Sequence, residues 1–186
     1  MTTSAYWPLF CEENVWHLTR NIASDVDEAL VVFISNRARR VAVWAQAAAN
    51  APTDPVIWDY HVILLELAGD SWRVTDPDSS LETPIDARSY LTDSFRSIGE
   101  ELSQLRPMFR LVPADQYRTR LRSDRSHMRS ATGKWLAPPP PGPPIGQDTD
   151  AAGSGASNLM RFVEMEHPFI GQICDLRGLL ARIGIG

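Results

Sequence analysis

The 186-residue sequence is poor in cysteine, with Cys11 and Cys174 alone, and only one of its 18 basic residues is a lysine. Two cysteines cannot cross-link a domain of this size into a secreted disulfide scaffold. Because the two do not form a CxxC pair, the sequence has no zinc-ribbon or thioredoxin motif. HExxH, GxGxxG and P-loop patterns are absent as well, so no motif predicts a metal or nucleotide site.

Long apolar runs are also missing. No stretch approaches the roughly 20 apolar residues that a membrane-spanning helix needs. The first ten residues, MTTSAYWPLF, place no basic region before an apolar run, so no signal peptide is recognised. We therefore expect a soluble, cytoplasmic protein with no membrane partner. The length is that of one domain, which we expect to span residues 1–186.

Negative charge exceeds positive charge, because 23 acidic and 18 basic residues give a net charge of −5. An acidic chain is a poor candidate for binding nucleic acid. The stretch from Arg106 to Lys134 is locally basic, with eight basic residues and two acidic ones. In this acidic context the stretch favours a solvated or structural face over a nucleic-acid site.

Periodicity predicts an α+β domain in which an antiparallel sheet is flanked by helices. Helices are expected over residues 11–22, 85–95, 113–122, 158–165 and 175–183, and strands over residues 30–35, 41–46, 56–67, 71–76 and 108–112. The proline run in residues 134–147 is typical of an extended segment, and residues 148–158 have a flexible-linker composition. We interpret residues 134–158 as a strap over the core and a linker within the single domain.

Three side chains in these elements can be interpreted as a nucleophilic site: Cys11, His61 and an aspartate of the predicted hairpin. Cys11 lies at the start of the first predicted helix, where the helix dipole and unpaired amides stabilise a thiolate. Glu12 and Glu13, in the same turn, oppose that effect. His61 lies within the strongest predicted strand and is a candidate base. A lone cysteine on an apolar helix face is usually a core residue, so the prediction rests on the combination.

The predicted hairpin supplies a carboxylate for the imidazole. If Leu67 pairs with Trp72, strand alternation places Asp78 opposite His61 and Asp76 at the diagonal position, both on the His61 face. Either acid could then orient the ring, as a catalytic triad requires. The spacing alone leaves Asp76 and Asp78 both open.

Several longer motifs carry a family resemblance. In chain order they are FCEENVWHL (10–18), VFISN (32–36), VIWDYHVILL (56–65), TDPD (75–78), SDRSHM (123–128) and GKWLAPPPPGPPI (133–145). Together they resemble the protein N-terminal glutamine amidohydrolase family over nearly the whole chain. The resemblance implies a papain-like or transglutaminase-like core and a Cys-His-Asp triad. Its motifs assign the triad to Cys11, His61 and Asp76, the first acid of the hairpin end.

The resemblance also implies an activity. The family converts the N-terminal glutamine of a protein or peptide to glutamate through a cysteine thioester and releases ammonia. In eukaryotes this step feeds an N-degron pathway. No metal or organic cofactor is expected, and the protein is expected to act as a monomer. Related alternatives are a broader protein deamidase, a transglutaminase, a cysteine protease and a non-catalytic reader of N-terminal residues.

Specificity for a chain terminus requires an acceptor for the substrate's α-ammonium group. Glu13 and Asp59 are the candidates, because Glu13 follows the nucleophile closely and Asp59 lies two residues from His61 on the same predicted strand face. His127 has no ligand-spaced partner in the sequence and receives no role.

Overall fold

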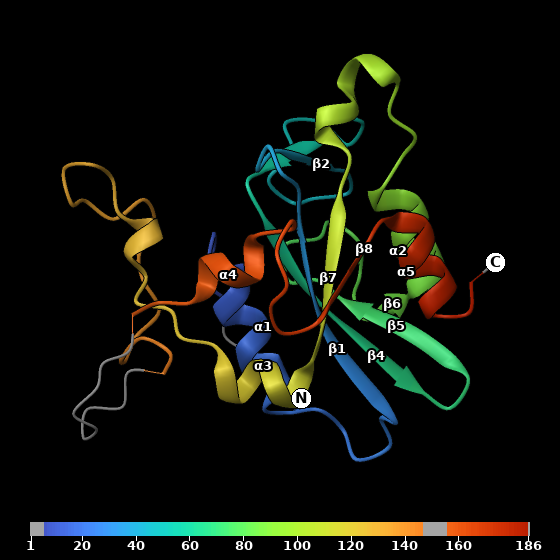
Figure 1. Cartoon of the computed structure of the whole chain (residues 1–186), viewed down its shortest axis with the longest axis horizontal. Helices are drawn as coiled ribbons and strands as arrows, with labels where there is room; N and C mark the ends of the chain where they lie inside the picture. Colours follow the sequence, from blue (N-terminus) through green and yellow to red (C-terminus); the bar gives the residue numbers. More distant parts are fainter. Residues whose placement is uncertain (1–5, 147–155, 186) are drawn as a thin grey trace.

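A six-stranded antiparallel sheet with the strand order β6-β5-β4-β1-β7-β8 forms the centre of the molecule (Figure 1). The computed structural model describes residues 6–146 and 156–185. The six strands are β1 Glu28–Ser35, β4 His61–Ala68, β5 Ser71–Thr75, β6 Ile85–Asp86, β7 Met108–Pro113 and β8 Gln172–Cys174. A separate two-stranded sheet pairs β2 Val41–Val43 with β3 Val56–Trp58.

Helices cover both faces of the large sheet, which gives three layers (Figure 1). One face carries α1 Cys11–Thr19, α3 Ala114–Arg120 and α4 Leu159–Val163, and the other carries α2 Ala87–Ser94 and α5 Leu176–Arg182. Side chains of β1 alternate between the two cores: Val31 and Phe33 pack on the α1 side, and Val32 on the other. Burial on both faces explains the uninterrupted apolar run of this strand. The predicted α+β class is therefore confirmed, whereas the papain-like or transglutaminase-like core stays a prediction.

The prediction of one strand over residues 56–67 is wrong, because the chain breaks at Asp59 and Tyr60 into β3 and β4. Asp59 Oδ1 accepts the Tyr60 N–H at 2.9 Å, and the Asp59 carbonyl accepts the Ser35 hydroxyl at 2.7 Å. These local bonds replace strand pairing, as short polar side chains often do. Strand alternation therefore does not carry through from Asp59 to His61.

Other predicted boundaries also move. The strand expected over 41–46 ends at Val43, because Ala45 takes a left-handed φ of 54° that a strand cannot contain. The helix expected over 85–95 begins after a short strand, where Asp86 caps the Ser89 N–H at 3.0 Å. Strand β8 and the 3₁₀ turns at Glu100–Leu105 and Ser126–Met128 were not predicted. Elements of only three to six residues are too short to show the periodicity on which such predictions rest.

The predicted strap is described for residues 134–146 and 156–158, and its middle part, residues 147–155, lies outside the described residues. The proline run contains no helix or strand of the named elements and is held through its carbonyls. Arg125 donates to the carbonyls of Pro140, Gly142 and Pro143 at 3.0, 3.1 and 3.4 Å. In the described parts of the chain, no helix has the length and apolar character to cross a membrane.

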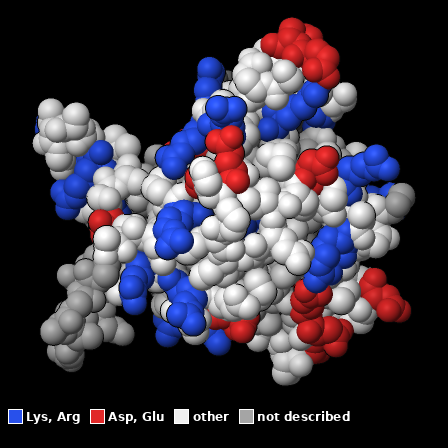
Figure 2. All heavy atoms as spheres, in the orientation of Figure 1, with Lys and Arg blue, Asp and Glu red and all other residues white. Residues whose placement is uncertain are grey.

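Basic side chains do not form one continuous patch on the face drawn in Figure 2, where they alternate with acidic ones. Within the locally basic stretch, several arginines have internal partners. Arg110 is fully buried and donates to the carbonyl of Phe162 at 3.0 Å, and Arg125 pairs with buried Glu13. The predicted structural use of this stretch is confirmed for these two arginines.

Candidate active site

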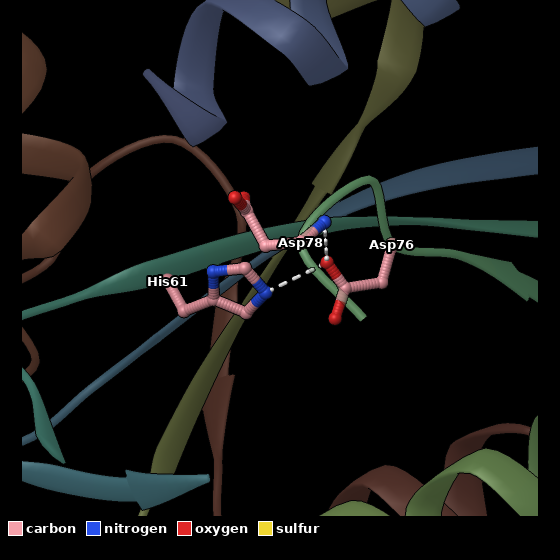
Figure 3. Close-up of side chains that lie close together, drawn as sticks. All are labelled: His61, Asp76 and Asp78. Carbon is pink, nitrogen blue, oxygen red and sulfur yellow. Dashed lines mark hydrogen bonds and ion pairs between the residues drawn. The ribbon is translucent and has the colours of Figure 1, made fainter. Parts of the chain in front are cut away.

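A fully buried histidine–carboxylate pair forms the centre of the candidate site. His61 is the first residue of β4, and its Nε2 lies 3.0 Å from Oδ1 of Asp76 (Figure 3). The predicted pairing of Leu67 with Trp72 is confirmed, and Thr75 opposite Leu64 is the last residue of β5. Asp76 is the first residue after β5 and is no longer paired with β4. Its side chain reaches the imidazole of His61.

Asp76 receives donors on both carboxylate oxygens. Tyr90 donates its hydroxyl to Oδ2 at 2.7 Å and Gln46 donates its amide to Oδ2 at 3.0 Å, while the Asp78 N–H reaches Oδ1 at 3.0 Å. Burial alone would raise the pKa of Asp76, but the charge and hydrogen bond of His61 and these donors lower it overall. Asp76 is therefore ionised at neutral pH.

The contact with Asp76 also changes the pKa of His61. Burial favours neutral His61, yet the charge and hydrogen bond of Asp76 outweigh it, so the pKa of His61 is raised. Nδ1 of His61 is buried and has no hydrogen-bond partner among the described residues. Figure 3 places that nitrogen on the side of the ring away from Asp76. One nitrogen of His61 is thus held by a carboxylate, and the other is open for proton transfer.

His61, Asp76 and Asp78 also offer three ligand atoms that lie within 4.8 Å of one another. Among the described residues this is the one such group of three or more. Both oxygens of Asp76 already accept hydrogen bonds, and Nε2 of His61 is bonded to Asp76. A metal ion held by all three residues would have to displace a hydrogen bond at Asp76, so the donor arrangement fits an oriented imidazole better than a metal centre.

Cys11 begins α1 and is 7% exposed. No side chain caps this end of the helix, so the first-turn N–H groups have no side-chain partner. Burial raises the pKa of the Cys11 thiol well above its usual range, and the nearby carboxylates, led by Glu12 and Asp78, raise it further. Burial and the nearby acids therefore outweigh the effect of the helix dipole on the pKa of Cys11. The resting group is a thiol.

A small cavity of about 190 Å³ is lined by the thiol and by Asp78, whose N–H bonds Asp76. It is lined by Leu9, Cys11, Trp58, Asp59, Tyr60, Asp78, His127, Met128 and Leu136. His61 does not line it directly but stacks on Trp58, with ring centroids 5.6 Å apart. A larger cavity of about 920 Å³, which includes Phe95, Met108 and Leu176, contains none of the predicted site residues.

The two predicted ammonium acceptors differ in their surroundings. Glu13 is buried and pairs with Arg125 through both oxygens, at 2.6 and 2.9 Å, and it does not line the cavity. Asp59 lines the cavity, is exposed, and holds the Tyr60 N–H. The structure thus brings Asp59 to the thiol's cavity and gives Glu13 a structural ion pair.

His127 is a cavity residue that sequence reasoning missed. Its Nε2 lies 3.2 Å from Glu12 Oε1, within ion-pair distance although not aligned as a hydrogen bond. Tyr60 donates its hydroxyl to the other oxygen of Glu12 at 3.0 Å. Burial would lower the pKa of His127, but Glu12 raises it overall. The sequence spacing around His127 gave no sign of this contact, because its partner comes from the distant helix α1.

Comparisons with known proteins identify the family of this chain. The family model described as N-terminal glutamine amidase matches residues 6–183. A human protein named protein N-terminal glutamine amidohydrolase is 38% identical over 172 residues, which cover 89% of this chain and 80% of the human one. Proteins of the same name from Bos taurus and Drosophila ananassae are 38% and 34% identical, cover 89% of this chain in each case, and are themselves covered over 79% and 88%. The chain belongs to the N-terminal glutamine amidase family.

Proposed function

We propose that this protein hydrolyses the side-chain amide of an N-terminal glutamine in a protein or peptide, giving glutamate and ammonia. The observation that carries the proposal is the buried His61–Asp76 pair beside a cavity lined by Cys11. The names of the relatives give the substrate class. The roles of the three residues are part of the proposal.

The first chemical step is attack by Cys11 on the amide carbon of the glutamine side chain. Because burial raises the thiol pKa, the proton must leave as the C–S bond forms, and the unpartnered Nδ1 of His61 is the group proposed to accept it. The first-turn N–H groups of α1 would hold the oxyanion of the tetrahedral intermediate. The imidazolium then returns the proton to the departing nitrogen, which leaves as ammonia.

The second half of the reaction consumes the thioester between Cys11 and the substrate. His61 takes a proton from water, the hydroxide oxygen bonds to the acyl carbon, and the C–S bond breaks. The thiol regains its proton from His61, so the enzyme returns to its starting state. Asp76 keeps Nε2 protonated and stabilises the imidazolium without accepting a proton itself.

Ammonia release tests this assignment directly. A glutamine-initiated peptide should yield ammonia, whereas an asparagine-initiated peptide and one with glutamine only in second position should not. Cys11→Ser and His61→Ala should each lower turnover by about 10³-fold or more. Cys174→Ser is the matched control, since this second free cysteine is half-buried in β8 and lies outside the cavity. Retained activity in Cys11→Ser would refute the proposed nucleophile.

The alternatives give different products in the same assay. Main-chain fragments indicate a cysteine protease, cross-linked amine adducts a transglutaminase, and ammonia from internal glutamine a broader deamidase. A non-catalytic reader binds the peptide without consuming it. The cytoplasmic location and monomeric state stay predictions, which cell fractionation and light scattering would test.

A further inference from the structure

The cavity beside Cys11 carries more negative than positive charge. Two carboxylates, Asp59 and Asp78, line it. The one lining side chain that can become cationic is His127, and it already lies 3.2 Å from the buried carboxylate of Glu12. Within the described residues the cavity therefore holds an unbalanced negative charge close to the thiol. Such a site favours a substrate group with a positive charge.

Of the two carboxylates that line the cavity, Asp78 has a buried oxygen without a hydrogen-bond partner. It is 5% exposed, and Tyr6 donates its hydroxyl to Oδ1 at 2.5 Å. Oδ2 is buried and has no hydrogen-bond partner among the described residues. A buried carboxylate oxygen without a hydrogen-bond donor destabilises the unbound protein. A ligand that brings a donor to this oxygen removes that cost. Figure 3 shows the Asp78 carboxylate turned away from Asp76, whose oxygens are occupied.

We propose that Oδ2 of Asp78 accepts the α-ammonium group of the substrate's first residue, and that this contact restricts the reaction to chain termini. The inference rests on the proposed function. In glutamine the α-nitrogen is four bonds from the amide carbon, so both groups can fit one small cavity. An internal glutamine presents a neutral amide there, which leaves the Asp78 charge unpaired and adds a preceding residue that must be accommodated.

The other carboxylates are less suited to this role. Glu13 is paired with Arg125 on both oxygens, and both oxygens of Asp76 are filled. Glu12 does not line the cavity and accepts the Tyr60 hydroxyl. Asp59 is exposed, so water competes for its charge and weakens its attraction for an ammonium group. Asp78 alone in this set combines burial, a free oxygen and a place on the cavity wall.

A second role for Asp78 has to be distinguished from this one. Its charge also contributes to the raised pKa of His61, so neutralising it would disturb the base as well. An effect through His61 applies to every substrate. An effect through the ammonium group applies only to substrates that carry one.

The test pairs one residue change with one substrate change. The substrates are a glutamine-initiated peptide and the same peptide lacking the α-amino group, which keeps the side-chain amide. We expect Asp78→Asn to lower kcat/KM for the ammonium peptide by about 10- to 150-fold, the equivalent of one charged hydrogen bond. The des-amino peptide lacks the ammonium contact, so its loss should be smaller than that of the ammonium peptide and reflect only the change at His61. Asp70→Asn, an exposed acid at the tip of the same hairpin, is the charge control.

Other results would overturn the inference. Equal losses on both peptides would mean that Asp78 acts through His61. A selective loss in Asp59→Asn instead would make Asp59 the acceptor. Thermal melting checks that Asp78→Asn is folded, and Asp78→Ser repeats the comparison with a smaller side chain that also lacks the charge.

A binding measurement separates this inference from the proposed reaction. In a Cys11→Ala background, calorimetry should show tighter binding of the ammonium peptide than of the des-amino peptide, and Asp78→Asn should remove that preference. If the wild-type protein releases no ammonia while the preference persists, the proposed reaction fails and the ammonium site stands. If Cys11→Ala shows no preference, the ammonium site is refuted whatever the activity.

Discussion

Replacing Arg125 with methionine tests how the region around Cys11 is held together. Arg125 donates to both oxygens of Glu13 and to three carbonyls of the proline run. One guanidinium thus joins the first turn of α1 to the strap. Methionine retains an aliphatic stem but makes none of these bonds. The left-handed φ of 60° at this position applies to both side chains, so the change isolates the lost interactions.

The expected loss follows from the burial of the pair. Glu13 is 1% exposed and would be left as an unpaired buried carboxylate. Removing one partner of a buried ion pair costs about 3–5 kcal/mol of unfolding free energy. For a chain of this length each kcal/mol lowers Tm by about 2–4 °C. Arg125→Met should therefore melt roughly 6–20 °C below the wild type.

The pH dependence gives this prediction a definite sign. Burial raises the pKa of Glu13, and Arg125 opposes that shift. Without Arg125 the folded-state pKa rises further above the unfolded value. An acid with a raised folded pKa destabilises the folded state above that pKa, and protonation relieves the cost as the pH falls. The Tm deficit of Arg125→Met should therefore shrink between pH 7 and pH 5.

Thermal and urea unfolding of a four-member cycle would measure the effect. Glu13→Gln combined with Arg125→Met removes the stranded charge, so the double variant should be more stable than Arg125→Met alone. A Tm loss below about 3 °C at pH 7, or a double variant no more stable than Arg125→Met, would refute the reasoning that Glu13 depends on Arg125.

Two further predictions concern the pair in the candidate site. Asp76→Asn should lower kcat by about 10³- to 10⁴-fold, because the amide no longer fixes the tautomer or stabilises the imidazolium of His61; a loss below tenfold would reassign the orienting acid. The pH profile of kcat/KM should have its acidic limb above pH 6.5, since Asp76 raises the pKa of His61, and activity needs the neutral base. In Asp76→Asn that limb should move to lower pH, and an unmoved limb would show that another group titrates.

The parts of the fold that were predictable from sequence are those fixed by local pattern. The start of α1 at Cys11 and the pairing of Leu67 with Trp72 follow from helical spacing and a short hairpin turn. The hairpin in turn explains why Asp76 and Asp78 both lie near His61. Local periodicity therefore predicted the acids near His61, although it left their separate roles open.

The parts that were not predictable depend on contacts between distant segments. The break at Asp59 leaves the apolar pattern of residues 56–67 intact and is specified by side-chain hydrogen bonds. His127 and Arg125 meet Glu12 and Glu13 across more than 100 residues. The available signal was the SDRSHM motif itself, which places an arginine and a histidine two residues apart without naming their acidic partners.

Asp76 and Asp78 are two residues apart on one hairpin end, yet their environments separate them. Donors and His61 lower the pKa of Asp76, whereas burial raises that of Asp78. Environments that shift the pKa values of two neighbouring carboxylates in opposite directions are typical of paired groups with different roles. The short backbone between them fixes the distance from the oriented imidazole to the proposed ammonium site. With the ammonium held at Asp78, an asparagine side chain is one methylene too short to bring its amide carbon to Cys11, so the same geometry selects glutamine by length.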